Sequence, residues 1–206
     1  FPRRQTLAGY FKSQEGEWDS NGQAIWIMER YARLAGRTLN PDQHRSIRRG
    51  VRWIERKLTH QSDEKPHAGL LPAGFSAEHL GPNDYYYWDD FWSIAGLEAA
   101  ARLFDAAGER DAALHAREVA AKLGGAIERS LQLTAARRDR PGIPASPYRR
   151  MDAGAIGSIA AGYPLQIWAP GEPRLLDTAD FLLEHCMVNG GFFQDMIHSG
   201  INAYLT

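Results

Sequence analysis

The chain has 206 residues, of which 44% are apolar, and its 24 basic and 25 acidic side chains leave a net charge of −1. This composition is typical of a soluble globular protein and indicates neither a nucleic-acid partner nor a membrane partner, since prolines interrupt even the longest uncharged window, residues 153–171. Cys186 is the only cysteine, which excludes an internal disulfide and favours a reducing, cytoplasmic location.

The first expected helix covers residues 21–34. Asp19 and Ser20 are good N-cap residues, and Gly36 is expected to end the helix. A second helix is expected after Asn40, because apolar residues recur there at spacings of four, three and four: Ile47, Val51, Ile54 and Leu58. The first helix is apolar through its first half, whereas the second has one apolar face and one charged face.

This alternation repeats along the chain. Helices that are nearly uncharged are expected at 85–107 and 153–161, and from Ser199 onward. Amphipathic helices are expected between them, at 109–133 and 174–187. A helix that is apolar all round belongs in a protein interior, and an amphipathic helix covers it from outside.

The fold class predicted is therefore all-α, with helical hairpins arranged as an inner and an outer layer. We interpret residues 1–206 as one domain, part of an (α/α)6 toroid with about three hairpins and the start of a fourth. The uneven intervals between the inner helices make an open solenoid the second choice. Each long loop precedes an inner helix, so all of these loops should gather at one face.

One of these loops has an unusual composition. Residues 78–92 place four carboxylates, Glu78, Asp84, Asp89 and Asp90, among aromatic rings. Aromatic faces pack against the C–H groups of sugars, and carboxylates bind hydroxyls or transfer protons. Asp89 and Asp90 lie in an otherwise uncharged run, and buried carboxylates are costly unless paired or hydrated. The pattern indicates a carbohydrate site.

These segments resemble the six-hairpin glycosidases, which include glucoamylases, maltose phosphorylases and the glucosidase domains of debranching enzymes. Residues 17–26, EWDSNGQAIW, are similar to the segment before the second inner helix of glucoamylases. In that family an Asp at the place of Asp19 binds hydroxyls of the sugar at the nonreducing end. The resemblance implies a glycosidase that acts on α-linked glucosides or related oligosaccharides, inverting, with hydrolysis or phosphorolysis as its reaction.

The family's general acid is a Glu in the loop before the third inner helix, and Glu78 occupies that place. Glucoamylases have a Trp directly before the acid, whereas this chain has Ala77. Trp88-Asp89-Asp90 therefore offers an alternative, in which Asp89 is the acid. Either carboxyl needs a raised pKa to stay protonated near neutral pH.

Several other residues are expected to bind substrate from the same face. These are Trp18, Asp19, Asp84, Tyr86, Trp88, Asp90, Trp92, Asp195 and His198. Asp195 is also the one late carboxylate in a loop of that face, but the family's base comes from the loop before the last inner helix. A six-hairpin ring needs about twice this chain, so we expect the remainder of the toroid, and the native start before Phe1, to belong to the same polypeptide.

Two alternatives remain open. Toroid-shaped sugar epimerases use paired histidines, and His79 and His198 are the candidates here. A non-catalytic carbohydrate-binding module is the other alternative. The histidines do not fall at metal-ligand spacings, and neither a metal nor another cofactor is expected.

Overall fold

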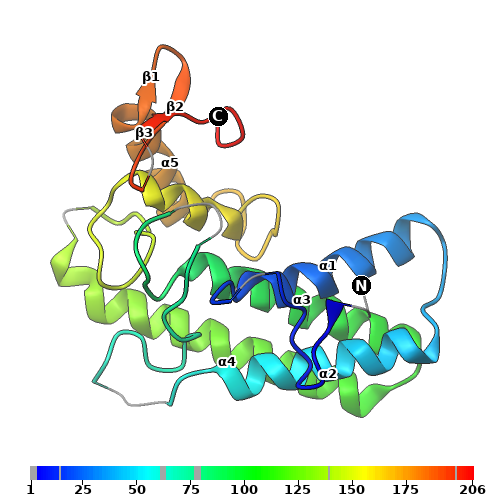
Figure 1. Cartoon of the computed structure of the whole chain (residues 1–206). Coiled ribbons are helices and arrows are strands. Elements are labelled where there is room, and N and C mark those ends of the chain that lie inside the picture. Colours follow the sequence, from blue (N-terminus) through cyan, green and yellow to red (C-terminus); the bar gives the residue numbers. More distant parts are fainter. Residues whose placement is uncertain (1–3, 14, 61–63, 77–79, 139, 198) are drawn as a thin grey trace.

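A computed structural model describes residues 4–206 apart from 14, 61–63, 77–79, 139 and 198. The structure is mostly helical, with a small antiparallel sheet near the C-terminus (Figure 1). Among the described residues, each helix is too short or too polar to cross a bilayer.

The first two helices form a hairpin with a short connection. Helix α1 spans Asp19–Leu34, and Gly36, with φ of 59°, lies just past its end, as predicted. Helix α2 spans Pro41–Lys57 and begins with a capping box, in which Asn40 and Gln43 bond each other's backbone N–H groups. The local sequence therefore fixes both ends of this connection.

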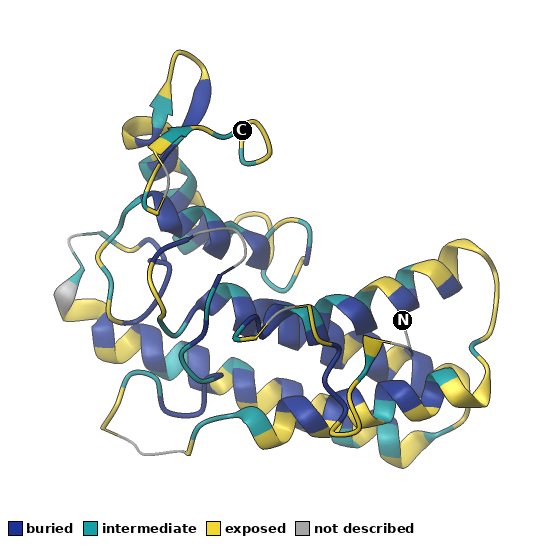
Figure 2. Ribbon diagram, viewed as in Figure 1, coloured by how far each residue is buried: buried dark blue, intermediate teal, exposed yellow. Residues whose placement is uncertain are grey.

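The second hairpin consists of α3, Tyr87–Ala106, and α4, Arg110–Thr134. Helix α3 is buried around almost its whole circumference, whereas α4 buries one face and exposes the other (Figure 2). The predicted contrast between an interior helix and an amphipathic cover is confirmed for this pair.

Helices α1 and α3 approach each other until their backbones touch. A Cβ added at Gly22 of α1 would lie 2.1 Å from the carbonyl oxygen of Trp92, and one at Gly96 of α3 would lie 2.6 Å from the Cα of Gly22. Only hydrogen side chains fit at this crossing. The two interior helices are thus direct neighbours, with α2 and α4 packed outside them.

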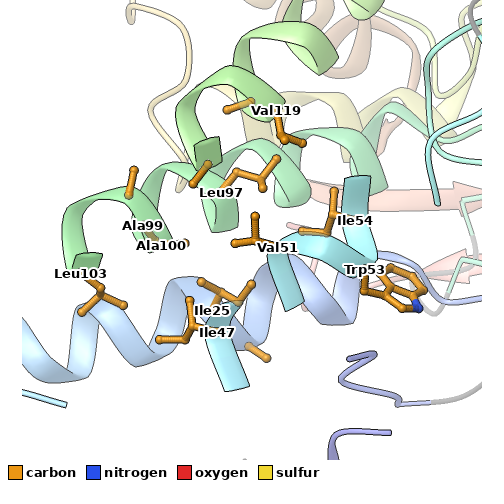
Figure 3. Close-up of a cluster of buried hydrophobic side chains, with 14 of the residues drawn as sticks. Ile25, Ile47, Val51, Trp53, Ile54, Leu97, Ala99, Ala100, Leu103 and Val119 are labelled. Carbon is orange, nitrogen blue, oxygen red and sulfur yellow. The ribbon is translucent and has the colours of Figure 1, made fainter. Parts of the chain in front are cut away.

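One apolar core joins these four helices. Ile25 of α1, Val51 of α2, Leu97 of α3 and Val119 of α4 converge in it (Figure 3). Ile47 and Val51 are buried as completely as Tyr87 and Phe91. This equal burial counts against the predicted separation into an inner layer with α3 and an outer layer with α2.

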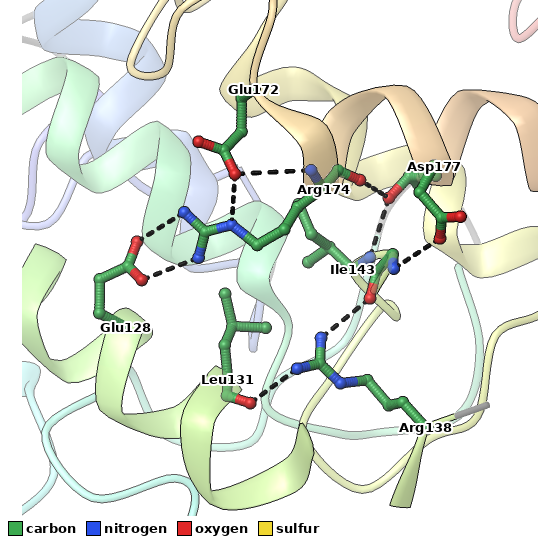
Figure 4. A network of polar contacts seen from close by, with 9 residues as sticks. Glu128, Leu131, Arg138, Ile143, Glu172, Arg174 and Asp177 are labelled. Atoms are coloured by element: carbon green, nitrogen blue, oxygen red, sulfur yellow. Dashed lines mark hydrogen bonds and ion pairs between the residues drawn. The ribbon is translucent and has the colours of Figure 1, made fainter. Parts of the chain in front are cut away.

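The third helical pair is shorter than the first two. The expected inner helix at 153–161 is present as a 3-10 helix, η3, Ala153–Ala161, and it packs against α3. Helix α5, Pro173–His185, covers η3. Arg174 of α5 binds both carboxylate oxygens of Glu128 on α4, at 2.8 and 3.0 Å (Figure 4). This bidentate ion pair ties the third pair of helices to the second.

Three short strands follow α5, where an uncharged helix beginning at Ser199 was predicted. The strands are β1, Met187–Val188, β2, Gly191–Asp195, and β3, Ser199–Ile201, in the antiparallel order β1-β2-β3. Asn189 and Gly190 both have positive φ and form the two-residue turn between β1 and β2. The prediction of a helix from Ser199 was wrong, because residues 199–201 form β3 and pair with β2. The chain is therefore not purely helical.

Candidate functional site

The loops that precede α1, α3 and η3 meet at one face, as predicted. The backbone N–H of Phe75 donates to the carbonyl oxygen of Gly16 at 2.9 Å. The hydroxyl of Ser146 donates to Oδ2 of Asp84 at 2.6 Å, and Arg149 donates to the carbonyl oxygen of Leu80 at 2.5 Å. These bonds join three loops that lie far apart in the sequence.

Asp19 lies at this face, in the first turn of α1. Its Oδ2 accepts hydrogen bonds of 2.8 Å from Trp88 Nε1 and from Gln23 Nε2. Only 5% of the residue is exposed. Burial raises the pKa of the carboxyl group, the indole N–H of Trp88 opposes that shift, and the charge of Glu17 adds to it.

The expected capping role of Asp19 is wrong. Trp18 is the N-cap residue of α1, and its side chain makes no capping bond. Asp19 is inside the helix, so its carboxylate extends sideways toward α3 and is held there by Trp88.

Trp18 lies on the other side of the helix start, away from Asp19 and Trp88. Its ring packs beside Tyr10 and Trp53, with the ammonium group of Lys57 3.9 Å from the ring centroid. The prediction that Trp18 and Asp19 line one pocket is wrong, because consecutive residues of a helix point about 100° apart. Trp18 stabilises the core between α1 and α2.

A cavity of about 610 Å³ opens between α1, α3 and the two ends of the chain. Three tryptophans contribute to its wall, with ring centroids 5.5 Å apart for Trp26 and Trp92 and 5.6 Å apart for Trp88 and Trp92. The indole Nε1 of Trp92 is buried and has no hydrogen-bond partner among the described residues. The remaining lining residues are Arg4, Phe11, Lys12, Ser13, Ser20, Gln23, Ala24, Ile27 and Tyr204. We refer to this space as the tryptophan cavity.

Asp89 and Asp90 do not line the tryptophan cavity, and each is 1% exposed. Oδ1 of Asp90 accepts the backbone N–H of Leu71 at 2.9 Å, which fixes the loop before α3 to the helix. Burial raises the pKa of the Asp90 carboxyl well above its usual range, and the bond from Leu71 partly opposes the shift. The predicted substrate contact of Asp90 is therefore corrected to a contact within the protein.

Asp84 and Tyr86 also bond within the loops and do not line the cavity. Asp84 accepts from Ser146 and from the N–H of Tyr85, and its backbone bridges to Gly74. The hydroxyl of Tyr86 donates to the carbonyl oxygen of Pro82, and burial raises the pKa of Tyr86 to about 12. Both residues hold the loops in position, and the prediction that they bind substrate in the cavity is corrected.

The remaining predicted site residues divide into two groups. Asp195 is exposed on β2, opposite Ser199 of β3, and it does not line the tryptophan cavity. Glu78, His79 and His198 lie outside the described residues, so their roles stay predictions. Within the described part of the chain, no group of three or more His, Cys, Asp or Glu side chains is placed to hold a metal ion.

Sequence reasoning missed several lining residues. Ser20, Gln23, Trp26 and Ile27 follow one another at spacings that place them on one face of α1, and this periodicity was available in the sequence. Arg4, Lys12 and Tyr204 come from the two ends of the chain, and only the tertiary structure brings them to the cavity.

Comparisons of the chain with protein-family models, curated proteins and solved structures find no match.

Proposed function

We propose that the tryptophan cavity binds a saccharide and that the chain belongs to the catalytic part of a glycoside hydrolase acting on α-linked glucosides or related oligosaccharides. The observation that carries the proposal is the wall of three tryptophans, Trp26, Trp88 and Trp92, around a cavity of about 610 Å³. The flat apolar faces of these rings are what sugar binding requires, and Trp88 also holds the buried carboxylate of Asp19 behind the wall.

The wall of the cavity suits a sugar. Indole faces pack on the C–H groups of a pyranose ring, while Ser20 and Gln23 offer polar partners for hydroxyl groups. A volume of about 610 Å³ lies in the range of small-molecule sites.

The proposed acid is Glu78, with Asp89 as the alternative that the resemblance leaves open. Asp89 is buried and does not line the tryptophan cavity, whereas a proton donor must reach the glycosidic oxygen. The loop before α3, which carries Glu78, is tied to the same face as Trp88 by its bonds at Leu71 and Gly74. This placement supports Glu78.

The layered helices support the toroid. Helices α1, α3 and η3 form a continuous inner layer, and α2, α4 and α5 lie outside it. On the outer edge of α1, Ile27, Tyr31 and Leu34 are 41%, 54% and 84% exposed. This apolar stripe at helical spacing is suited to a further inner helix, as a closed ring of hairpins would supply.

Sugar binding without catalysis is the second candidate, because the described residues that line the cavity include no carboxylate. Isothermal titration and product analysis distinguish the two. We expect maltooligosaccharides or related glycosides to bind and to be cleaved, and proton NMR of the first anomer released to show inversion. Binding without any cleavage would support the second candidate, and no binding of any saccharide would contradict both.

A further inference from the structure

The charged residues that line the tryptophan cavity are all basic. Arg4 and Lys12 belong to the lining, and among the described lining residues there is no Asp or Glu. The guanidinium group of Arg30 also lies near the wall, 4.9 Å from the ring centroid of Trp26. A neutral sugar requires no such excess of positive charge.

Arg4 and Lys12 face each other across a short antiparallel ladder. Gln5 pairs with Phe11, so Arg4 lies directly opposite Lys12, and the N–H of Lys12 donates to the carbonyl oxygen of Arg4 at 3.3 Å. Side chains at directly opposed positions project from the same face of a ladder, and like charges there destabilise it. A bound anion between the two side chains would reverse this repulsion.

Internal counter-charges are weak at this place. Lys12 forms an ion pair of 2.8 Å with Glu15, but the two side chains are 44% and 79% exposed, and solvent screens such pairs. The side chain of Arg4 forms no ion pair with any residue that the structure describes. Asp19 lies behind Trp88, with two N–H donors on its carboxylate. The positive charge at the mouth of the cavity is therefore available to a ligand.

We propose that the saccharide bound in the tryptophan cavity carries a negatively charged substituent, a carboxylate or a sulfate, which Arg4 and Lys12 bind. This inference rests on the proposed function, because it assumes that the cavity binds a sugar. The tryptophans hold the ring, the two basic side chains select the charge, and neutral glucosides bind more weakly than their acidic counterparts.

Isothermal titration of the whole chain with matched probes tests the inference. The acidic probes are trigalacturonate and sulfated maltotriose, and the neutral partners are methyl-esterified trigalacturonate and maltotriose. We expect at least one acidic probe to bind roughly tenfold more tightly than its neutral partner, since hydrogen bonds to charged groups are stronger than those between neutral groups. The preferred probe identifies the substituent, and its advantage should shrink as salt is added.

Two variants and one control test whether Arg4 and Lys12 cause the preference for the acidic probe. Arg4→Gln and Lys12→Gln should each remove most of the advantage of the acidic probe over its neutral partner. Arg52→Gln removes an exposed positive charge from α2, outside the cavity, and should not change that advantage. If all three variants lost this advantage equally, the preference would depend only on the net charge of the protein, and the inference would be overturned.

The remaining outcomes separate this inference from the proposed function. Equal binding of acidic and neutral probes, unaffected by Arg4→Gln and Lys12→Gln, would overturn the acidic preference and leave the sugar site in place. Failure of all four probes to bind would overturn both.

Discussion

The indole Nε1 of Trp88 donates a hydrogen bond of 2.8 Å to Oδ2 of Asp19 and so links the first turn of α3 to the first turn of α1. The two residues are 69 positions apart in the sequence. The bond orients the Trp88 ring in the wall of the cavity and supplies a donor to a carboxylate that is otherwise desolvated. The orientation of the Trp88 ring and the protonation of Asp19 are therefore coupled.

Replacing Trp88 by Phe should raise the pKa of Asp19 further, because the indole N–H stabilises the charged carboxylate against burial. A group whose folded pKa is raised contributes stability below its unfolded pKa, and this contribution is lost as pH rises through the folded pKa. The variant should lose more stability over that interval than the natural chain does. Carbon-13 NMR titration of the Asp19 carboxyl group measures the shift directly.

Trp26→Phe is the matched control, since Trp26 lines the same cavity and makes no hydrogen bond to Asp19 among those the structure shows. It should leave the pKa of Asp19 unchanged. An equal shift in the two variants would mean that the hydrogen bond from Trp88 does not set the protonation of Asp19.

Asp90 should make the protein less stable as pH rises above the ordinary Asp value of 3.8, because its folded pKa is raised well above that value by burial. Asp90→Asn does not titrate, and it keeps an acceptor for the N–H of Leu71. In this variant the unfolding free energy should therefore fall less steeply as pH rises. Asp90→Ala loses the acceptor as well, and it should cost about 1–3 kcal/mol from the unpaired N–H. Urea unfolding at several pH values measures both effects, and an unchanged slope in Asp90→Asn would contradict the assignment.

Gly22→Ala should destabilise the fold by about 1–3 kcal/mol, because its Cβ would collide with backbone atoms of Trp92 where α1 crosses α3. Gly125→Ala is the control. Gly125 is inside α4, and an added Cβ there meets no atom within 4 Å, so alanine should stabilise the helix by about 0.5–1 kcal/mol. Thermal unfolding of both variants checks the prediction, and two changes of the same sign would contradict the close approach.

The catalytic assignment is tested by Glu78→Gln in the complete polypeptide. If Glu78 protonates the leaving oxygen, the variant should lose on the order of 10²–10⁴-fold in kcat with little change in KM. A glycosyl fluoride needs less protonic assistance, so the variant should recover much of its rate on that substrate. Recovery by Asp89→Asn and none by Glu78→Gln would move the acid into α3.

The helices were predictable because their signals are local. The apolar spacing in α2, the capping box at Asn40, and Gly36 after α1 each act within a few residues. The contrast between α3 and α4 was also predictable, because α3 has no charged residue between Phe91 and Leu97, whereas charged residues follow one side of α4. The hairpin between β1 and β2 also has a local signal, Asn189-Gly190, although no strand was predicted there.

The candidate site was predictable only in part. The sequence placed Asp19, Trp88 and Trp92 at one face; the structure places Trp88 and Trp92 in the wall of the tryptophan cavity and bonds Asp19 to Trp88 behind it. It could not assign Trp18 and Asp90 to the core, because helical direction at the first turn depends on where α1 begins and on which loop packs above α3. The exposure of a carboxylate is not a property of its residue type.

The sequence by itself determined the order of the helices α1 to α5, their two classes and the face at which the inner helices begin, because periodicity and end signals depend on neighbours in the chain. Only the tertiary structure decided which side chains share the cavity. The hydrogen bond from Trp88 to Asp19, the contact of Gly22 with Gly96, and the basic pair of Arg4 and Lys12 beside the tryptophans depend on how separate elements pack. Packing is set by the shapes of whole surfaces, and no short segment of sequence contains that information.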